Sequence, residues 1–475
     1  MGNLLAYGML LAWPVVTMVL MLTMPARRAA VWALLGAYLL LPPSVGVDLP
    51  VIPALNKSSI PSIATFLAVL LWAPPGTFRW PRNGLVKLLM LCYVISPVLT
   101  GLANGDTIRL GTMVQPAIDW YTALSYAADK AIDLLPFIVG ISLFRTEENY
   151  RELLFAFVFA GLVYSLPVLV EATRTPFLAA RLYGVNPGAY FVQQMRGDGF
   201  RAMVFLDHGL LVSAFLGLAF LAAIGMWRAR LPVWVFPAGL CALWLFIVLL
   251  FNKTLGAVLL LALLTPPLLV LRPRRFLSIA MILACVIVTY PMLRAADLIP
   301  TERLTQWVEP WSEQRAQSAA FRFRNEDMLL DKANDRPLLG WGGYGRNRVF
   351  VVSSSGEAQD VSVTDGTWIL AMGIYGWVGY LALFGLLCYP IAHVFRQRKH
   401  VVSPLTAALV AMLVFNLLDL LPNSSLRPIT WLIAGALSGL VAARRMAPTP
   451  QRPMDEEPAH KRPQARALTE PLGQG

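Results

Sequence analysis

The strongest constraint on this chain is its division into apolar blocks of roughly 17 to 25 residues, separated by shorter polar segments. Such a block is long enough to cross the hydrocarbon core of a bilayer as an α-helix, with every backbone hydrogen bond made internally. Of the 475 residues, 57% are hydrophobic and only 14% are charged. A soluble fold needs more charged residues to cover its surface, so the sequence predicts an all-α, polytopic integral membrane protein.

The apolar blocks predict about thirteen transmembrane helices. We expect an N-terminal bundle of about ten helices over 1–293, a large loop over 294–365, C-terminal helices over 366–443 and a disordered tail over 444–475. The expected helices begin, to within about four positions, near Leu4, Ala29, Ile60, Leu85, Leu134, Leu153, Val204, Val233, Leu255, Phe276, Gly366, Pro404 and Pro428.

Basic residues predict the orientation because they gather in alternate connections, from Arg27 and Arg28 near the start to Arg444 and Arg445 near the end. Lys and Arg are retained on the cytoplasmic side, so these connections are predicted to be cytoplasmic, as is the C-terminus. The N-terminus then faces outward. The intervening segments also face outward and include every long connection: 44–59, 104–133, 172–203, 294–365 and 422–427.

Within the second of these outward segments, the stretch from Trp120 to Ile132 mixes apolar and charged residues and forms no clean span. It is expected to be an amphipathic helix on the outer surface of the membrane.

Several classes of function are disfavoured. The net charge of +12 does not indicate a nucleic-acid partner, because the basic residues lie in short clusters between apolar blocks. The four cysteines lie inside apolar blocks without CxxC spacing, so neither a zinc site nor a disulfide framework is expected. The chain lacks the GxxxxGK[ST] pattern of a phosphate loop. We expect no metal and no cofactor.

The segment from Arg294 to Asp365 is longer than a simple connector and should be folded or functional. It contains F-R-F-R-N-E-D at 321–327 and D-R-P-L-L-G-W-G-G-Y-G at 335–345. The proline and glycines are equally well explained as residues that end a helix and turn the chain back to the membrane.

Arg322, the P-L-L-G-W-G run at 337–342 and the G-I-Y-G-W-V-G run at 373–379 together resemble the signature of the O-antigen ligase and Wzy-type O-antigen polymerase superfamily. Two shorter pieces resemble it less closely: Arg201 through His208-Gly209, and N-K-T-L-G-A at 252–257. With the topology, the likeness covers residues from about 150 to 440. Where many members carry a His-Asn pair before the span after the long loop, this chain has T-D-G-T at 364–367, so a histidine role does not carry over there.

The resemblance implies a glycosyltransferase of the bacterial inner membrane that uses a polyprenyl-diphosphate-linked glycan as donor, outside the cytoplasm and without a metal. The leading hypothesis is polymerisation of lipid-linked O-antigen or exopolysaccharide repeat units. The alternatives are a ligase that moves a finished glycan to another acceptor, a lipid-linked oligosaccharide transporter or flippase, and a non-enzymatic assembly component. The expected partners are the glycan donor and acceptor, membrane lipids, and as candidates a chain-length regulator and a flippase.

Four basic residues are candidates for contact with the diphosphate. A leaving lipid diphosphate gathers negative charge in the transition state, and arginine offers a planar, bidentate partner for phosphate oxygens. We expect Arg201 and Arg322 to be catalytic and Arg324 and Lys253 to bind substrate. The alternatives are ion pairs within the loop or headgroup contacts for the arginines, and snorkelling for Lys253.

The acceptor hydroxyl must lose a proton to a positioned base. Asp365 is one candidate, and its alternative role is the N-cap of the following helix. His208 is the other, and its alternative is a hydrogen bond inside the bundle. Asp365 is preferred because it stands where relatives carry histidine. Glu171 and Asp419, toward the outer ends of spans, are further candidates.

Overall fold

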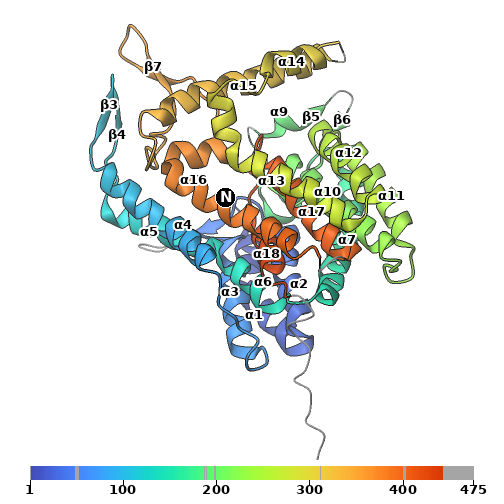
Figure 1. The fold of residues 1–475 in the computed structure, drawn as a ribbon. Coiled ribbons are helices and arrows are strands. Elements are labelled where there is room, and N and C mark those ends of the chain that lie inside the picture. The colour runs from blue at the N-terminus through green and yellow to red at the C-terminus, as the bar shows by residue number, and fades with distance from the viewer. Residues whose placement is uncertain are drawn as a thin grey trace, which may run out of the picture.

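The computed structural model describes residues 2–48, 53–186, 188, 190–196, 199–310, 312–399 and 403–441. These residues form a mostly helical bundle, drawn in Figure 1. The predicted disordered tail, with Arg444 and Arg445, lies outside the described residues.

A helix is present at each of the thirteen predicted positions. Helix α7 begins six residues earlier than predicted, because its first turn is polar and includes Glu147 and Glu148. Helices α10 and α11 begin five residues later than predicted, because turns occupy the residues ahead of them, with Val204 at a positive φ and Val233 bridged to Phe236. The bounds are α1 Leu4–Thr23, α2 Ala26–Leu40, α3 Ser59–Trp72, α4 Gly84–Ala103, α6 Leu135–Leu143, α7 Glu147–Thr173, α10 Gly209–Arg228, α11 Ala238–Phe251, α12 Leu255–Val270, α13 Pro273–Ala295, α16 Thr367–Arg396, α17 Pro404–Asp419 and α18 Pro428–Ser438.

Six of these helices are long and apolar enough to cross a membrane on their own: α1, α4, α7, α10, α13 and α16. Five more are apolar but shorter, namely α3, α11, α12, α17 and α18. The prediction of a helical, membrane-embedded chain agrees with these apolar helices. The number of thirteen crossings stays a prediction.

The remaining elements lie in the connections. They are the helices α5 Trp120–Asp133, α8 Leu178–Tyr183, α9 Tyr190–Gln194, α14 Thr301–Val308 and α15 Glu313–Asn334, and the antiparallel hairpins β1 Gly46–Val47 with β2 Leu55–Asn56, β3 Ile108–Leu110 with β4 Met113–Gln115, β5 Met195–Arg196 with β6 Gly199–Phe200, and β7 Phe350–Val352 with β8 Ala358–Asp360. The all-α prediction therefore holds for the bundle, while short hairpins stand in four connections of the described chain. The predicted amphipathic helix is α5, which buries only Ala123 and Ala127.

Helix α10 lies at the centre of the bundle and packs against α7, α11, α12 and α17. Nearly all of its residues from Gly209 to Met226 are buried. A helix that is apolar on every side can be covered by lipid or by other helices, and in α10 the covering is by neighbouring helices on almost every side.

Helices α6 and α18 approach each other unusually closely, through Gly140 and Gly435. A Cβ atom at Gly140 would lie 2.6 Å from the Leu432 carbonyl oxygen, and one at Gly435 would lie 2.1 Å from that of Phe137. Small residues allow two membrane helices to bring their backbones together, so dispersion contacts replace the missing hydrophobic drive.

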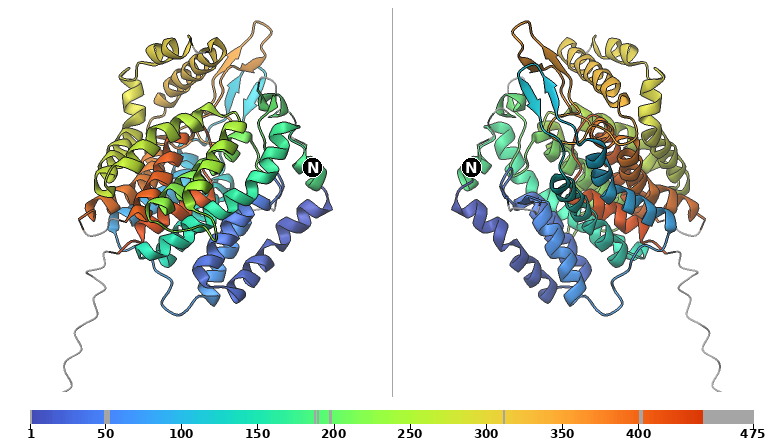
Figure 2. Two further views of the ribbon diagram at one scale, coloured as in Figure 1. Left: turned by 90° about the vertical axis from the view of Figure 1, so that its right-hand side faces the viewer. Right: turned by 90° about the vertical axis from the view of Figure 1, so that its left-hand side faces the viewer.

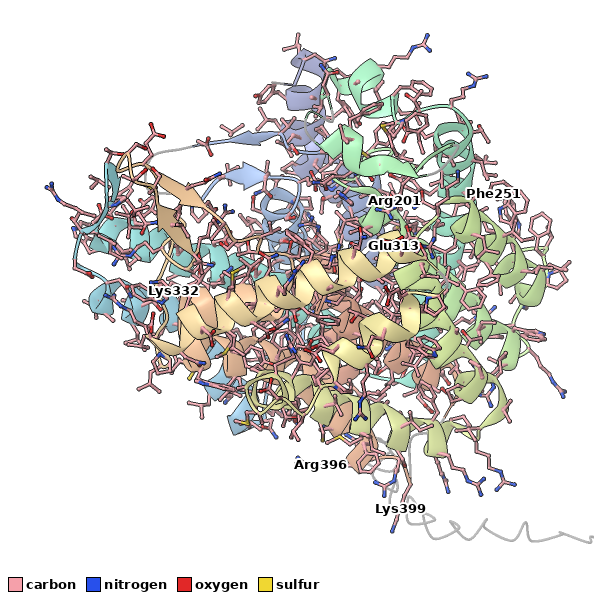
Figure 3. The ribbon with its side chains drawn as sticks, turned by 90° about the horizontal axis from the view of Figure 1, so that it is seen from above. Arg201, Phe251, Glu313, Lys332, Arg396 and Lys399 are labelled. Atoms are coloured by element: carbon pink, nitrogen blue, oxygen red, sulfur yellow. The ribbon has the colours of Figure 1, made fainter. Side chains whose placement is uncertain are left out.

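Helix α15 lies across one end of the bundle, as the view from above shows (Figure 3). Helices α14 and α15 and the β7–β8 hairpin are at this end, and the turn between α1 and α2 is at the opposite end (Figure 2). On α15, Leu329, Leu330 and Ala333 are buried. Arg294, at the end of α13, pairs with Asp327 at 2.5 Å and Glu326 at 3.6 Å, which fixes α15 to the membrane helices.

Candidate functional site

The two longest runs of the superfamily resemblance contact each other directly. Helix α16 is broken at Gly376, whose φ of +63° is not helical. A break of this kind leaves backbone N–H and C=O groups without helical partners, and these groups need new ones when they are buried. The 337–342 run supplies them through four backbone hydrogen bonds: Trp341 N to Gly373 O (2.8 Å), Gly342 N to Ile374 O (2.9 Å), Trp377 N to Pro337 O (2.8 Å) and Val378 N to Leu338 O (3.2 Å).

Glycine is required on both sides of this contact. Gly340 has a φ of +69°, and a Cβ there would lie 2.5 Å from the Ile374 carbonyl. A Cβ at Gly376 would lie 2.4 Å from the carbonyl carbon of Leu338. The alternative explanation of the glycines also fits, since α15 ends at Asn334 and the run turns the chain back toward α16. The run therefore both turns the chain and completes the broken helix.

Charged side chains hold the run in place. Trp341 lies between Lys332 and Arg336, whose cationic groups are 3.6 and 4.2 Å from the centre of its ring. Arg346 is fully buried and donates to the backbone oxygens of Asp106 (2.7 Å) and Pro116 (2.9 Å). These contacts tie the run to the connection between α4 and α5.

Arg322 and Asp365 form an ion pair at the head of α16. Arg322 Nε lies 3.4 Å from Asp365 Oδ2, and each side chain is about two-fifths exposed (38% and 42%). The N-cap of α16 is Gly366, so the predicted capping alternative for Asp365 does not hold. The two residues line a small hollow together with Glu326, Ile369 and Pro422.

Asp419 lies beside this pair, at the end of α17. Its carboxylate is buried and accepts hydrogen bonds from Asn423 Nδ2 (2.8 Å) and Ser425 Oγ (2.7 Å). Arg322 also interacts electrostatically with it. The turn between α17 and α18 therefore adjoins the Arg322–Asp365 pair, and Thr367 Oγ1 donates to the Asn423 carbonyl at 3.0 Å.

A second ion pair joins the same turn to the segment before α10. Asp207 Oδ2 lies 3.6 Å from Arg427 Nη2, and its Oδ1 accepts hydrogen bonds from the Ser44 backbone and hydroxyl. Burial alone would raise the pKa of Asp207, but the nearby charges of Lys57 and Arg427 hold it below its usual value. Lys57 donates to the Phe205 carbonyl at 2.8 Å, and its burial lowers its pKa to about 8.

We call the set Lys57, Asp207, Arg427, Asp419, Arg322 and Asp365 the charged network. It carries three cations and three carboxylates and reaches from the connection before α3 to the head of α16. Sequence reasoning missed Lys57 and Arg427. Each is the single basic residue in a short connection that is predicted to face outward. Basic residues usually lie in cytoplasmic connections, so these two exceptions could have been noticed in the sequence.

Arg201, His208 and Lys253 gather around the segment 199–209. Arg201 is buried, its backbone N–H donates to Gln194 O (2.8 Å), and its aliphatic stem packs where a Cβ on Gly209 would be. Lys253 Nζ would lie 2.6 Å from a Cβ on Gly199. The structure thus brings these three predicted residues into one neighbourhood.

His208 caps α10. Its Nδ1 accepts a hydrogen bond from Leu210 N (3.1 Å), and its Nε2 lies 3.3 Å from Gln193 Oε1. When Nδ1 accepts, the neutral ring carries its proton on Nε2, which then donates to the glutamine oxygen. Neither nitrogen offers a free lone pair in this arrangement, which favours the hydrogen-bonding alternative over a role as base.

Glu171 anchors the 199–209 segment. Its buried carboxylate accepts four backbone N–H groups: Phe177 (3.0 Å), Leu178 (2.8 Å), Met203 (2.9 Å) and Val204 (2.7 Å). Asn252, from the 252–257 run, accepts from Ala202 N (2.7 Å) and donates to Gly209 O (3.1 Å). Both residues hold the backbone around Arg201, so we assign them a positioning role.

Arg324 does not share a face with Arg322. The two are two residues apart on α15, and Arg324 is exposed. The convergence of Arg201 and Arg322 on one diphosphate stays a prediction. The charged network links the region of Arg201 to the region of Arg322. Asp207 belongs to the 199–209 segment, and it pairs with Arg427 in the turn that adjoins the Arg322–Asp365 pair.

Glu326 is a further candidate that the sequence reasoning missed. It lies one helical turn from Arg322 and lines the same hollow. Burial raises its pKa to about 7, although Arg294 and the Trp368 indole N–H favour the charged form. The sequence contains a pattern that could have identified Glu326: it is four residues after Arg322, a spacing that places both side chains on one face of a helix.

Comparison with protein-family models gives no match, and neither does comparison with curated proteins. The fold and site define a mostly helical protein with membrane-length apolar helices and a charged network at one end of the bundle.

Proposed function

We propose that this protein is a glycosyltransferase that polymerises polyprenyl-diphosphate-linked repeat units. The observation that carries the proposal is the Arg322–Asp365 pair at the head of a helix whose break is closed by the 337–342 run. The residues that carry the superfamily resemblance in the long loop thus contribute to a single arrangement at one end of the bundle.

The chemistry of the pair suits transfer from a lipid diphosphate. Arg322 faces Asp365 through Nε, and within the described chain neither of its terminal nitrogens has a hydrogen-bond partner. Two N–H-bearing nitrogens in a fixed plane match the oxygens of a phosphate, whose negative charge grows as the glycosidic bond to it breaks. Arg322 then stabilises the leaving diphosphate.

The two carboxylates that line the hollow, Asp365 and Glu326, have different roles toward the acceptor hydroxyl. Asp365 faces a guanidinium and orients the acceptor hydroxyl. Glu326, with its pKa near 7, accepts the proton of that hydroxyl, because a base works best when its pKa is close to the working pH. The oxygen of the acceptor forms the new bond to the anomeric carbon as the bond to the diphosphate breaks.

The orientation is part of the proposal: the end that carries α15 faces the periplasm, the opposite end faces the cytoplasm, and the chain crosses the inner membrane of a bacterium about thirteen times. Contacts among the basic connections support it. Arg27 and Arg28 share Glu152, and Arg274 donates to the Lys399 carbonyl, so basic segments from distant parts of the sequence lie close to one another.

Cysteine labelling tests the orientation. In a background without the four native cysteines, an impermeant reagent applied to outer-membrane-permeabilised cells should label Ser354→Cys, in the β7–β8 turn, and leave Thr449→Cys unlabelled. Labelling at Thr449→Cys with protection at Ser354→Cys would reverse the orientation and remove the site from the periplasmic side.

The activity is tested with the full-length protein in lipid vesicles and a polyprenyl-diphosphate-linked repeat unit. Longer lipid-linked product supports polymerisation, and transfer only to a different glycan acceptor would indicate a ligase. Arg322→Ala should abolish most product, while Arg303→Ala, an exposed arginine on α14, should leave it unchanged. Movement of the donor across the bilayer without any new glycosidic bond would contradict both enzymatic functions.

A further inference from the structure

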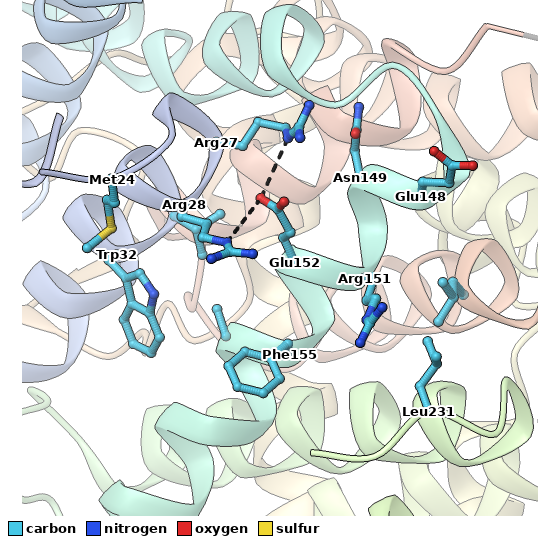
Figure 4. Close-up of a pocket in the computed structure, with 13 residues that line it drawn as sticks. Met24, Arg27, Arg28, Trp32, Glu148, Asn149, Arg151, Glu152, Phe155 and Leu231 are labelled. Carbon is cyan, nitrogen blue, oxygen red and sulfur yellow. Dashed lines mark ion pairs between the residues drawn. The ribbon is translucent and has the colours of Figure 1, made fainter. Parts of the chain in front are cut away.

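A large cavity lies at the end of the bundle opposite α15. Its volume is about 970 Å³, and it is formed between the start of α2, the first turns of α7 and residues Leu231 and Leu405 (Figure 4). Three arginines line it, Arg27, Arg28 and Arg151. None of these residues belongs to the charged network, and the proposed glycosyl transfer does not use them.

The arginines outnumber the carboxylate that pairs with them. Glu152 Oε2 lies 3.6 Å from Arg27 Nε and 3.8 Å from Arg28 Nε, too far for a hydrogen bond in either case. Arg27 Nε and Glu152 Oε2 are both buried without a hydrogen-bond partner. Arg151 has no ion pair within the described chain. Buried polar atoms normally find a partner, so this group has unused capacity for a hydrogen-bonding ligand.

A neighbouring cavity extends the basic surface. Its volume is about 530 Å³, it shares Arg27 and Asn149 with the first cavity, and it adds Arg145. Across the two cavities the lining holds Arg27, Arg28, Arg145 and Arg151 against Glu148 and Glu152. The excess of arginine favours an anion.

The wall of the larger cavity away from the arginines is apolar and aromatic. It includes Trp32 and Phe155, both of which stack on or contact the Phe159 ring at 6.0 Å. Phe159 in turn contacts Trp234, whose side chain is 72% exposed. Tryptophan exposed beside basic residues is typical of the level where lipid headgroups meet the hydrocarbon core.

We propose that this cavity binds the headgroup phosphate of an anionic phospholipid, with the acyl chains along the aromatic wall. Arginine side chains hold the phosphate oxygens through paired N–H groups, and basic pockets between membrane helices are suited to this class of lipid. The aromatic wall is the feature that a free phosphate ion would not need. The proposal is independent of the glycosyl-transfer function.

The test uses the full-length protein in a zwitterionic detergent, with dioleoylphosphatidylglycerol as the probe and its binding followed by thermal stabilisation and by native mass spectrometry. Dioleoylphosphatidylcholine and inorganic phosphate serve as competing probes. Arg151→Gln should weaken phosphatidylglycerol binding roughly fivefold, and Arg28→Gln with Arg151→Gln roughly 30-fold. Arg275→Gln, an exposed arginine at the start of α13 and outside the cavity, is the matched control.

The outcomes decide the proposal. Selective stabilisation by phosphatidylglycerol that is lost in the cavity variants and kept in Arg275→Gln supports it. Equal effects of phosphatidylglycerol and phosphatidylcholine, or equal losses in Arg275→Gln, would overturn it in favour of general surface attraction. Stabilisation by inorganic phosphate as strong as that by phosphatidylglycerol would overturn the lipid assignment and leave an anion site. Arg151→Gln keeps the test valid if the double variant fails to fold, because Arg151 is exposed.

Discussion

The two ends of the bundle use arginine in different ways. At the end that carries α15, four arginines each have a carboxylate of their own: Arg294 with Asp327, Arg322 with Asp365, Arg348 with Asp360 and Arg427 with Asp207. Two more, Arg336 and Arg346, share Asp106. At the opposite end, Arg27 and Arg28 share Glu152 at distances of 3.6 Å or more. Arginines and their carboxylates are therefore nearly matched in number at the first end, whereas at the second end the arginines outnumber the carboxylate that pairs with them.

Arginines at the two ends are therefore expected to contribute differently to the stability of the fold. A paired arginine inside the protein has lost its water and depends on its partner, so removing it leaves a buried acceptor unsatisfied. An exposed arginine such as Arg151 keeps its solvation and contributes little to folding. Substitutions at the two ends should accordingly differ in their effect on stability.

The largest effect is expected for Arg346→Met. Arg346 is fully buried and donates to two backbone oxygens and to Asp106, so its loss should lower the free energy of unfolding by about 3 to 5 kcal/mol. Thermal unfolding in detergent measures this. Arg348→Met is the control, because Arg348 pairs with Asp360 at an exposed site and should cost less than about 1 kcal/mol. An equal loss of unfolding free energy in the two variants would show that burial does not determine how much each arginine contributes to stability.

The next effect is on activity. Arg322→Ala should reduce the rate of glycan transfer by roughly 30-fold to 1000-fold, or about 2 to 4 kcal/mol of transition-state stabilisation. Arg322→Lys should recover little, because lysine keeps the charge and loses the planar pair of donors. Arg324→Ala, on the exposed side of α15, should have a much smaller effect. Near-normal product from Arg322→Lys would mean that any positive charge suffices.

Glu326 gives a prediction in pH. Its pKa is raised from 4.5 to about 7 in the folded protein, so the folded state holds a proton that the unfolded state releases. Its contribution to stability is fully present below about pH 4.5 and is lost as the pH rises through about 7, by at most about 3 kcal/mol. Thermal unfolding at pH 5 and pH 8 should therefore show wild type losing stability relative to Glu326→Gln.

The activity of wild type should change in the opposite direction, because a base acts in its deprotonated form. We expect the rate to rise with pH through about 7 in wild type and to be low at every pH in Glu326→Gln. An unchanged pH–rate profile in Glu326→Gln would assign proton transfer to Asp365, to be tested with Asp365→Asn.

The smallest effect is expected at the opposite end of the bundle. In lipid-free detergent, Arg151→Gln should change the free energy of unfolding by less than about 0.5 kcal/mol, because Arg151 is exposed. A large loss of stability would mean that the arginines at this end are structural, and the contrast between the two ends would disappear.

The sequence predicted the helices well, because apolar length is set by local composition and each predicted position holds a helix. It placed the start of α10 too early, since the turn before that helix depends on the distant partners Glu171 and Asn252. It also placed α11 too early, because a local bridge between Val233 and Phe236 holds a turn there, and α7 six residues too late. It identified Arg322 and Asp365 separately. The alternative it gave for Arg322, an ion pair within the loop, is present in the structure, but the identity of the partner could not be derived from spacing. The alternative role of Asp365 as the N-cap was wrong, because Gly366 is the N-cap of α16.

The remainder of the site is assembled from connections far apart in the chain. Lys57, Asp207 and Arg427 come from three different connections, those before α3, α10 and α18, and only tertiary packing brings their charges together. Glu326 looked like one acidic residue among several in the 321–327 run. Its raised pKa follows from burial against Tyr290 and Trp368, which the local sequence does not contain.

The break at Gly376 makes the first part of α16 a short separate segment that can rotate about Gly376. The segment from Thr367 to Tyr375 has nine residues and is therefore about 13 Å long, with Gly376 as its pivot and Asp365 just beyond its other end, where the Thr367 N–H donates to Leu420 O at 2.9 Å. A rotation of about 5° at the pivot would carry that end through about 1 Å, a displacement large enough to change a reaction rate by about a hundredfold. The four backbone hydrogen bonds from the 337–342 run span this pivot. On the proposed function, the 337–342 run therefore helps to position the Asp365 carboxylate, although no side chain of the run lines the hollow.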